Sequence, residues 1–340
     1  MMRAVSNRRL TLLMTFVMGL AACGSTYRAT PTTPPSIAAP LPTRTPTNTP
    51  GTGTWTDGAA LPKAVSEVGV ALLDNRIHVL GGYIDGHPAS RTHQVYDVTT
   101  GRWTTAAPLP EALDHVAAVA TTDAVYAIGG YDARGATTGV YRYDPRTDTW
   151  TARAPIPDAR AAAAVVLLQG KIHLIGGRDT RGDVRSHDVY DPDTDRWSGA
   201  ASLPTARDHA AFAVLDNKIH VVGGRPGSLT VHEVYDPDTD AWTTAAPLPA
   251  GRNSCAGVVL DGALWVIGGE DPQETRVYPQ TWRYEPSTDS WSAGPALPQA
   301  VQGTGAVAVD GRIYLPGGGP VAGGREQSAR LQVFMIQTAS

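Results

Sequence analysis

The feature that most constrains this chain is a repeat with a period in the high forties. A Gly-Gly doublet closes an apolar segment in each repeat, and successive doublets are separated by 48, 47, 47, 45 and 49 residues. The doublets begin at Gly81, Gly129, Gly176, Gly223, Gly268 and Gly317. Tryptophans keep the same steps, at Trp55, Trp103, Trp150, Trp197, Trp242 and Trp291. Such a period indicates a repeat architecture, in which each unit buries its apolar face against its neighbours.

Each repeat has the pattern of four short strands. In the third unit, residues 160–168 form an apolar run, and residues 171–176 form a second run that is rich in β-branched residues. Residues 187–191 alternate in hydrophobicity, and residues 196–199 follow a turn as the last strand. Connections this short favour antiparallel neighbours, and four antiparallel strands per period describe one blade of a β-propeller. We therefore predict one array over residues 52–340 rather than two separate domains.

The recurring pattern of Leu-Pro, Arg, Ile-His/Tyr-Val-Ile-Gly-Gly, Val-Tyr-Asp-Pro and Trp resembles the kelch repeat over residues 52–340. This resemblance implies an all-β, six-bladed propeller with four antiparallel strands per blade. The sixth unit is incomplete, because Phe334 stands in its tyrosine position and its tryptophan would fall one residue beyond Ser340. Trp55 has no blade of its own upstream. We therefore predict that the strand at residues 53–57 completes the last blade, which leaves no open edge between blades.

The start of the chain predicts export and a lipid anchor. Residues 1–22 carry three arginines before an apolar run too short to span a bilayer comfortably, which is typical of a secretory signal peptide. The segment ends in Leu-Ala-Ala followed by Cys23, which resembles a bacterial lipobox and implies lipidation of Cys23. An ordinary signal peptide with a chance cysteine is the alternative. Residues 23–51 are rich in Thr and Pro, so we predict a disordered tether. The expected location is the outer face of a bacterial membrane, at the cell surface or in the periplasm.

Two repeat positions are predicted to meet around one mouth of the channel. In an antiparallel blade, the start of the first strand, the end of the second and the start of the third lie on one face. Sixteen residues before each doublet stand Val65, Leu113, Arg160, Arg207, Arg252 and Val301. Directly after each doublet stand Tyr83, Tyr131, Arg178, Arg225, Glu270 and Gly319. One half of this rim would be rich in guanidinium groups and the other half apolar and aromatic.

A lopsided rim of this kind suits an amphipathic anionic ligand. Arginine binds a carboxylate through two parallel hydrogen bonds, and tyrosine stacks on a sugar ring or an apolar group. The acidic and imidazole groups just inside the rim, which include Glu67 and Asp208, would reduce the positive electrostatic potential of the rim. We therefore predict ligand binding by Arg160, Arg207, Arg252, Arg178, Arg225, Tyr83, Tyr131, Asp114, His115, His209 and Glu270. The alternative is that the arginines belong to the repeat motif and brace neighbouring loops.

We expect no cofactor and no metal ion. His78, His173 and His220 occupy a strand position that tyrosine or tryptophan fills in the other repeats, which favours packing over metal ligation. The Asp-x-Asp-x-Asp turns at residues 191–195 and 236–240 lack the glycine and the closing glutamate of a calcium loop. Cys255, among small residues, is interpreted as a buried structural thiol.

The predicted function is a membrane-tethered binding module that recognises an anionic protein or glycan ligand. The tyrosine of the third strand, or its equivalent, stands only 11 to 16 residues after the second glycine of the doublet, and connections this short favour a shallow recognition surface over an enclosed active site. The alternative is an enzyme that acts on acidic sugars, similar to N-acetylneuraminate epimerases, with Glu270 or Glu67 as general base. The net charge of −4 does not favour a nucleic-acid partner, and we expect a monomer.

Overall fold

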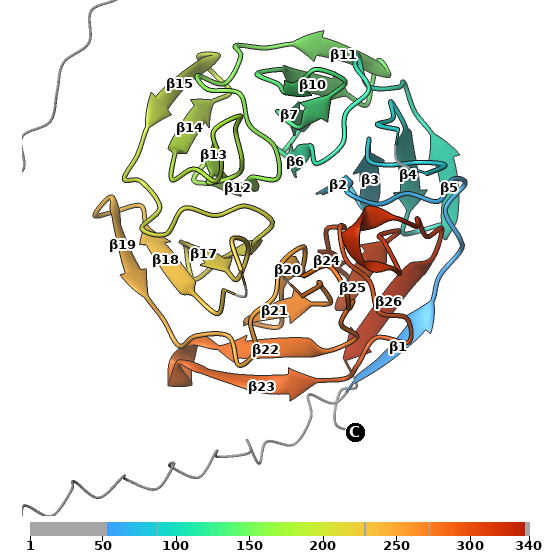
Figure 1. Ribbon diagram of the computed structural model, residues 1–340. Coiled ribbons are helices and arrows are strands. Elements are labelled where there is room, and N and C mark those ends of the chain that lie inside the picture. The colour runs from blue at the N-terminus through green and yellow to red at the C-terminus, as the bar shows by residue number, and fades with distance from the viewer. Residues whose placement is uncertain (1–52, 87, 228, 272, 337–340) are drawn as a thin grey trace, which may run out of the picture. The chain divides into compact units, whose positions relative to one another are not determined.

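The computed structural model describes residues 53–86, 88–227, 229–271 and 273–336, which form six four-stranded sheets arranged around a central channel (Figure 1). The predicted all-β, six-bladed propeller is therefore confirmed. The predicted signal peptide (1–22), the lipidation site Cys23 and the tether (23–51) lie outside the described residues. In the described ranges, none of the helices has the length and apolar character that a bilayer crossing requires.

Each of the first three blades runs outward from the channel in four antiparallel strands. Blade one contains β2 (Gly69–Leu73), β3 (Arg76–Leu80), β4 (His93–Asp97) and β5 (Arg102–Thr105). Blade two contains β6 (Ala117–Ala120), β7 (Val125–Ile128), β10 (Val140–Asp144) and β11 (Thr149–Ala152), with the small hairpin β8 (Tyr131–Asp132) and β9 (Gly135–Ala136) between its second and third strands. Blade three contains β12 (Ala164–Leu168), β13 (Lys171–Ile175), β14 (His187–Asp191) and β15 (Arg196–Gly199).

The last three blades continue the series. Blade four contains β16 (Ala211–Leu215), β17 (Lys218–Val222), β18 (His232–Asp236) and β19 (Ala241–Thr244). Blade five contains β20 (Ala256–Leu260), β21 (Ala263–Ile267), β22 (Thr281–Glu285) and β23 (Ser290–Gly294). Blade six contains β24 (Val307–Val309), β25 (Arg312–Pro316), β26 (Leu331–Ile336) and, as its outer strand, β1 (Gly53–Asp57). Two single 3₁₀ turns, η1 (Pro286–Thr288) and η2 (Ala322–Gly324), lie in loops of blades five and six.

Blade six closes the ring with strands from both ends of the described chain. β1 pairs antiparallel with β26, so that Trp55 lies opposite Phe334 and their ring centroids are 5.2 Å apart. In Figure 1 the blue β1 lies along the red β26. The predicted closure by the N-terminal strand is confirmed. Its physical reason is that the last sheet would otherwise present a row of unpaired backbone groups.

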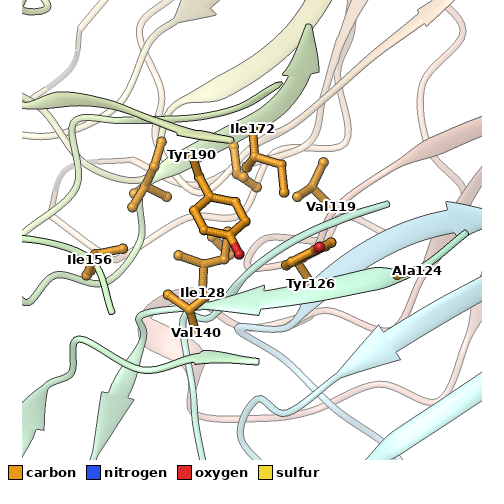
Figure 2. Packing of buried hydrophobic residues seen from close by; sticks show 12 residues of the cluster. Val119, Ala124, Tyr126, Ile128, Val140, Ile156, Ile172 and Tyr190 are labelled. Carbon is orange, nitrogen blue, oxygen red and sulfur yellow. The ribbon is translucent and has the colours of Figure 1, made fainter. Parts of the chain in front are cut away.

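The hydrophobic core is divided into six clusters that lie between neighbouring blades. Figure 2 shows the cluster between blades two and three, where Tyr126 and Ile128 of β7 face Ile172 of β13 and Tyr190 of β14. Full burial of one such side chain contributes about 1.5–3 kcal/mol to the free energy of unfolding. Because every cluster needs two blades, no blade can bury its apolar face alone.

Hydrogen bonds at the outer edge join each blade to the one before it. The indole N–H of Trp150 donates to the carbonyl oxygen of Ala107 over 2.9 Å, and the N–H of Ala107 donates to Asp148 over 2.7 Å. Asp148 also accepts the hydroxyl hydrogen of Tyr143 over 2.8 Å. The same indole-to-carbonyl bond joins Trp55 to Pro295, Trp103 to Ala59, Trp197 to Ala154, Trp242 to Ala201 and Trp291 to Ala246. These bonds explain why the tryptophan keeps the period of the repeat.

Around the axis, one residue of each blade takes part in a closed ring of backbone hydrogen bonds. Every member donates its N–H to the carbonyl oxygen of the corresponding residue in the preceding blade, over distances of 2.6 to 3.1 Å. Every member also has a positive φ, between 50° and 63°. We call this set the axial ring, and in donor-to-acceptor order it contains Glu67, Gly303, Ser254, His209, Ala162 and His115. The N–H of His115 donates to the carbonyl oxygen of Glu67 and closes the ring. The ring brings six residues that are far apart in sequence to the channel axis, five of which carry a side chain.

Three blades carry a buried pair of histidines between their second and third strands. In blade three, Nδ1 of His173 lies 2.9 Å from Nε2 of His187, and Nδ1 of His187 lies 3.1 Å from the carbonyl oxygen of Ala201. The carbonyl requires a proton on Nδ1 of His187, so its Nε2 accepts the hydrogen bond and both rings are neutral. The rings pack on Tyr235 of the next blade. His78 with His93 and His220 with His232 repeat this arrangement. Packing, as predicted for the strand histidines, accounts for them.

These neutral pairs predict a loss of stability in mild acid. Burial lowers the pKa of His173, and likewise that of His187, to about 4. In the unfolded chain, histidine takes up a proton below about pH 6.5. The unfolded state therefore binds more protons between these values, and the free energy of unfolding falls as the pH drops from about 6.5 towards 4. Each unit by which the pKa of a histidine differs between the folded and unfolded states changes the free energy of unfolding by up to about 1.4 kcal/mol. Urea denaturation at a series of pH values measures this slope.

Blade two provides the control for this prediction. It carries Tyr126 and Val140 in the positions of the histidine pair. A chain with His173→Tyr and His187→Val should keep its stability at pH 7 within about 2 kcal/mol and lose less of it on acidification. A free energy of unfolding that is equal at pH 7 and pH 5 in the parent chain would contradict the assignment.

Candidate functional site

Three of the predicted ligand-binding residues, Arg160, Arg207 and Arg252, do not lie on the rim. Each is only 1 % exposed. In blade four, Nη1 of Arg207 lies 2.6 Å from Oε2 of Glu233 on β18, and its Nη2 donates to the carbonyl oxygen of Val221 over 3.0 Å. The prediction that these arginines bind ligand at the mouth is therefore corrected. Their side chains hold strands together inside the blades.

The backbone explains why this position is buried in every blade. The carbonyl oxygen of Arg207 accepts a hydrogen bond from Gly177, the second glycine of the doublet in the preceding blade, over 2.9 Å. A Cβ on Gly176 would lie 2.6 Å from that same oxygen. The doublet and the position sixteen residues before the next doublet thus form one contact between two blades. Arg160 pairs with Asp188 and Arg252 donates to the carbonyl oxygens of Gly268 and Gln280, in keeping with the alternative that these arginines are bracing residues.

The other predicted residues surround a cavity of about 250 Å³ at one mouth of the channel. It is formed by the residues after the doublets, by residues of the axial ring, by Asp208 next to the ring and by two loop positions. Its lining consists of Glu67, Tyr83, His115, Tyr131, Arg178, Asp208, His209, Arg225, Glu270, Glu274 and Gly323. Asp114 lies behind His115. We call this set the mouth cavity.

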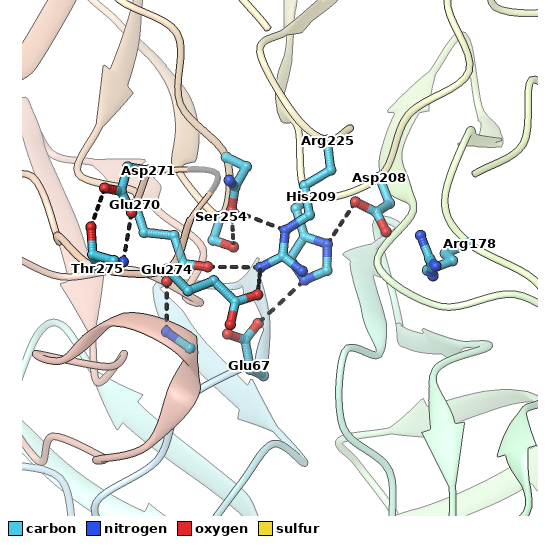
Figure 3. Close-up of polar contacts among 12 residues, drawn as sticks. Glu67, Arg178, Asp208, His209, Arg225, Ser254, Glu270, Asp271, Glu274 and Thr275 are labelled. Carbon is cyan, nitrogen blue, oxygen red and sulfur yellow. Dashed lines mark hydrogen bonds and ion pairs between the residues drawn. The ribbon is translucent and has the colours of Figure 1, made fainter. Parts of the chain in front are cut away.

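Arg225 is held by two carboxylates on one side of the mouth cavity. Its Nη2 lies 2.7 Å from Oε1 of Glu270 and 3.2 Å from Oε1 of Glu274, as Figure 3 shows. The backbone N–H of Gly323 donates to the other oxygen of Glu270 over 2.7 Å. Burial raises the pKa of Glu270, although the N–H of Gly323 and the charge of Arg225 oppose this. Arg225 therefore already has anionic partners.

Arg178 and two tyrosines form the opposite side. The Arg178 side chain is 49 % exposed and pairs with Asp183 over 2.7 Å. The rings of Tyr83 and Tyr131 meet His115 edge-on, with centroids 5.6 and 5.5 Å from the imidazole. Burial raises the pKa of both tyrosines, so they remain neutral hydroxyl groups. Guanidinium and aromatic groups therefore share one rim, as predicted, but with fewer free cationic groups than predicted.

The floor of the mouth cavity is a cluster of one glutamate and two histidines from the axial ring. Nε2 of His115 lies 3.2 Å from Oε2 of Glu67, and Nε2 of His209 lies 3.9 Å from the same oxygen. Nδ1 of each ring faces an aspartate, at 2.5 Å from Oδ1 of Asp114 for His115 and at 2.9 Å from Oδ1 of Asp208 for His209. Figure 3 shows His209 between Asp208 and Glu67. Both imidazoles thus present Nε2 to one carboxylate.

The charge of this cluster is dominated by carboxylates. Burial alone would lower the pKa of His115, but Glu67 and Asp114 outweigh it and raise that pKa. The pKa of Asp208 is lowered, because His209, Arg225 and Arg178 outweigh the effect of burial. The floor can therefore hold protons or a cation, and it is unfavourable for a free anion.

The same cluster also closes the channel. Glu67, His115 and His209 line a second cavity of about 120 Å³, which runs along the inner strands. Its other walls are small or apolar and include Ala118, Phe212 and Gly257. Cys255 also lies there, and burial raises the pKa of its thiol to about 11, which agrees with a structural role. The polar chemistry of the channel is thus concentrated where the two cavities meet.

Sequence reasoning placed Asp114, His115, Asp208, His209 and Glu67 near one mouth but did not predict that their side chains meet. The signal was an Asp-His dipeptide at the same repeat position of blades two and four. These blades are not neighbours, and side chains of non-adjacent blades meet only because the axial ring is narrow. Comparison of single blades could not show this convergence.

The family model described as the KLHDC2/KLHL20/DRC7 Kelch-repeats domain matches residues 52–203 and 153–319 of the chain. The two matches overlap and together cover most of the propeller. Among curated proteins, no match was found.

The corrected role of the arginines predicts an effect on stability. Arg207→Ala leaves Glu233 buried without its partner, and removal of one member of a buried pair costs about 3–5 kcal/mol. Urea denaturation should show this loss. Replacement of both members, as Arg207→Met with Glu233→Leu, should recover most of it. Arg178→Ala is the matched control on the exposed side and should change the free energy of unfolding by less than about 1 kcal/mol. A loss in Arg207→Ala no larger than in Arg178→Ala would refute the bracing role.

Proposed function

The chain belongs to the kelch-repeat propeller family, and from this premise we propose that it is a binding module whose ligand enters the mouth cavity. The ligand is a small anionic group carried by a glycan or a protein, and it binds at the rim beside Arg178, away from the acidic floor. The observation that supports this most is the convergence of Arg178, Arg225, Tyr83 and Tyr131 on one concave, solvent-connected cavity. Concave sites with a few convergent polar groups are the usual form of ligand sites.

The two arginines would contribute unequally. Arg178 offers an accessible guanidinium, with one nitrogen engaged by Asp183. Arg225 is more constrained, because its Nε donates to Asn253 over 3.2 Å and its Nη2 faces Glu270 and Glu274. An anionic ligand would therefore bind first to Arg178, with its apolar part against Tyr131, which shares that side of the cavity. The short loops around the mouth leave the site open to a ligand attached to a larger molecule.

The predicted leader and lipid at Cys23 complete the proposal. A signal peptide over residues 1–22, a lipidated Cys23 and a tether over residues 23–51 would present the propeller outside the cytoplasm, on the outer face of a bacterial membrane, as a monomer. Kelch propellers generally mediate protein interactions, which fits a displayed binding module.

Loss of the mouth arginines tests the proposal. The chain with Arg178→Ala and Arg225→Ala should lose at least tenfold in affinity for its anionic ligands on a glycan and peptide array, because a hydrogen bond to a charged group contributes about 1.5–3 kcal/mol. Arg146→Ala is the control, since Arg146 is 83 % exposed on an outer turn of blade two. Binding that survives the double replacement, or that is lost equally in Arg146→Ala, would place the ligand elsewhere.

A second candidate function is catalysis on an acidic sugar, and one observation favours it. The carboxyl of Glu270 is buried, faces the mouth cavity and has a raised pKa, which are properties of a general base. A coupled assay of N-acetylneuraminate mutarotation, with Glu270→Gln as the inactive variant, tests it. An equal rate with and without saturating protein would exclude it.

A further inference from the structure

The floor of the mouth cavity has the composition of a metal centre. We propose that Glu67, His115 and His209 bind one divalent first-row transition metal ion, of which Zn²⁺ is the reference probe. The proposal concerns the ion alone and is independent of which ligand the mouth cavity takes. It also departs from the expectation of no metal, which considered the strand histidines and the aspartate turns.

The three candidate ligand atoms already lie close to metal-binding distances. The imidazole and carboxylate atoms all lie within 4.8 Å of one another, and Nε2 of His115 lies 3.2 Å from Oε2 of Glu67. Ligands at about 2.0–2.1 Å from a tetrahedral Zn²⁺ are separated by roughly 3.3 Å. Nε2 of His209 lies 3.9 Å from the same oxygen of Glu67, so it would have to approach the carboxylate by about 0.6 Å to reach that separation. Two histidines and one carboxylate leave a further position for water or an exogenous oxygen.

The surroundings of the two imidazoles supply the second argument. A histidine that binds metal through Nε2 usually donates its Nδ1–H to a carboxylate or a carbonyl, which fixes the tautomer and the ring orientation. Asp114 occupies that place for His115, with its Oδ1 2.5 Å from Nδ1. Oδ1 of Asp208, whose carboxylate is 1 % exposed, lies 2.9 Å from Nδ1 of His209, but these two atoms do not have hydrogen-bond geometry. Two blades therefore present an Nε2 to one point on the axis, each with an aspartate beside its Nδ1.

The axial ring leaves space at this point for the carboxylate. A Cβ on Gly303 would lie 2.4 Å from Oε1 of Glu67, so a larger residue at this position would displace the carboxylate. Ala162 and Ser254 are the other small members of the ring. Ala162 has a φ of 52°, which shows that alanine is accommodated by the backbone of the ring.

Charge balance supports a cation at the same place. Glu67, Asp114, Asp208 and Glu270 are buried around the floor, and among these described carboxylates only Glu270 forms an ion pair with a guanidinium, that of Arg225. Buried carboxylates are costly unless they are paired or bind a metal ion. A divalent ion between Glu67 and the imidazoles would offset part of this charge. It would also give an anionic ligand in the mouth cavity a positive group to approach.

Other histidines of the described part of the chain do not compete for the ion. His78 with His93, His173 with His187 and His220 with His232 are buried between strands, with one ring bonded to the other and the second ring facing a carbonyl oxygen. His115 and His209 are the two described histidines that face a carboxylate through Nε2.

The test is stoichiometric metal binding by the chain without tag histidines. After chelator treatment, calorimetric titration with Zn²⁺ should show one ion per chain, and Co²⁺ should give the visible absorption of a site with nitrogen and oxygen ligands. His115→Ala and His209→Ala should each reduce the Zn²⁺ affinity at least a hundredfold. Asp114→Asn should reduce it roughly tenfold to a hundredfold, because it removes only the support of a ligand.

Two further variants keep the test decisive if a histidine variant fails to fold. Gly303→Ala removes no ligand but displaces the Glu67 carboxylate, so it should weaken Zn²⁺ binding and change the Co²⁺ spectrum. Ser254→Ala is the control in the same ring, and it should leave both unchanged. The absence of stoichiometric binding would overturn the proposal. The three residues would then form an imidazole–carboxylate cluster without a metal ion. Stoichiometric binding that is equal in the parent chain, His115→Ala and Gly303→Ala would also overturn it.

Discussion

The ring of six backbone hydrogen bonds around the axis is the constraint on which the rest of this structure depends. Each bond joins one blade to the blade before it, so the ring exists only when all six blades are in place. A non-glycine residue in the left-handed region costs about 1–2 kcal/mol, which is similar to the net gain from one hydrogen bond. The ring therefore adds little stability of its own. The apolar clusters between the blades supply the stability, and the ring fixes where each blade stands.

The same ring creates the candidate site. Because its members have the same backbone conformation, each directs its side chain into the narrow channel whatever its type. Glu67, His115 and His209 come from blades one, two and four and share one point, while Ala162 and Gly303 leave room for them. A symmetric backbone thus carries an asymmetric set of side chains. The chemistry of the propeller lies in the departures from its repeat.

Residues that obey the repeat have structural roles. The doublet at Gly176 and Gly177 has a positive φ at both positions, and the carbonyl oxygen of Arg207 in the next blade approaches it closely. The sequence showed that Arg160, Arg207 and Arg252 share one repeat position, and that the position lies near one mouth. It could not show whether the side chains point into the channel or into the blades, because this depends on a rotation about the strand that periodicity does not record.

The sequence by itself determined the number of blades, the strand order within a blade and the closure of the last blade by residues 53–57. The spacing gives the number of repeats and shows that the surplus Trp55 fits the one vacant position, and the resemblance to the kelch repeat implies that the repeats close into a ring. The tertiary structure alone decided which side chains meet. The Arg207–Glu233 pair lies inside one blade and depends on the rotation of the strand, whereas the Glu67–His115–His209 cluster spans three blades and depends on how closely the strands approach the axis. That distance is set by the packing of all six blades together, so no single repeat contains it.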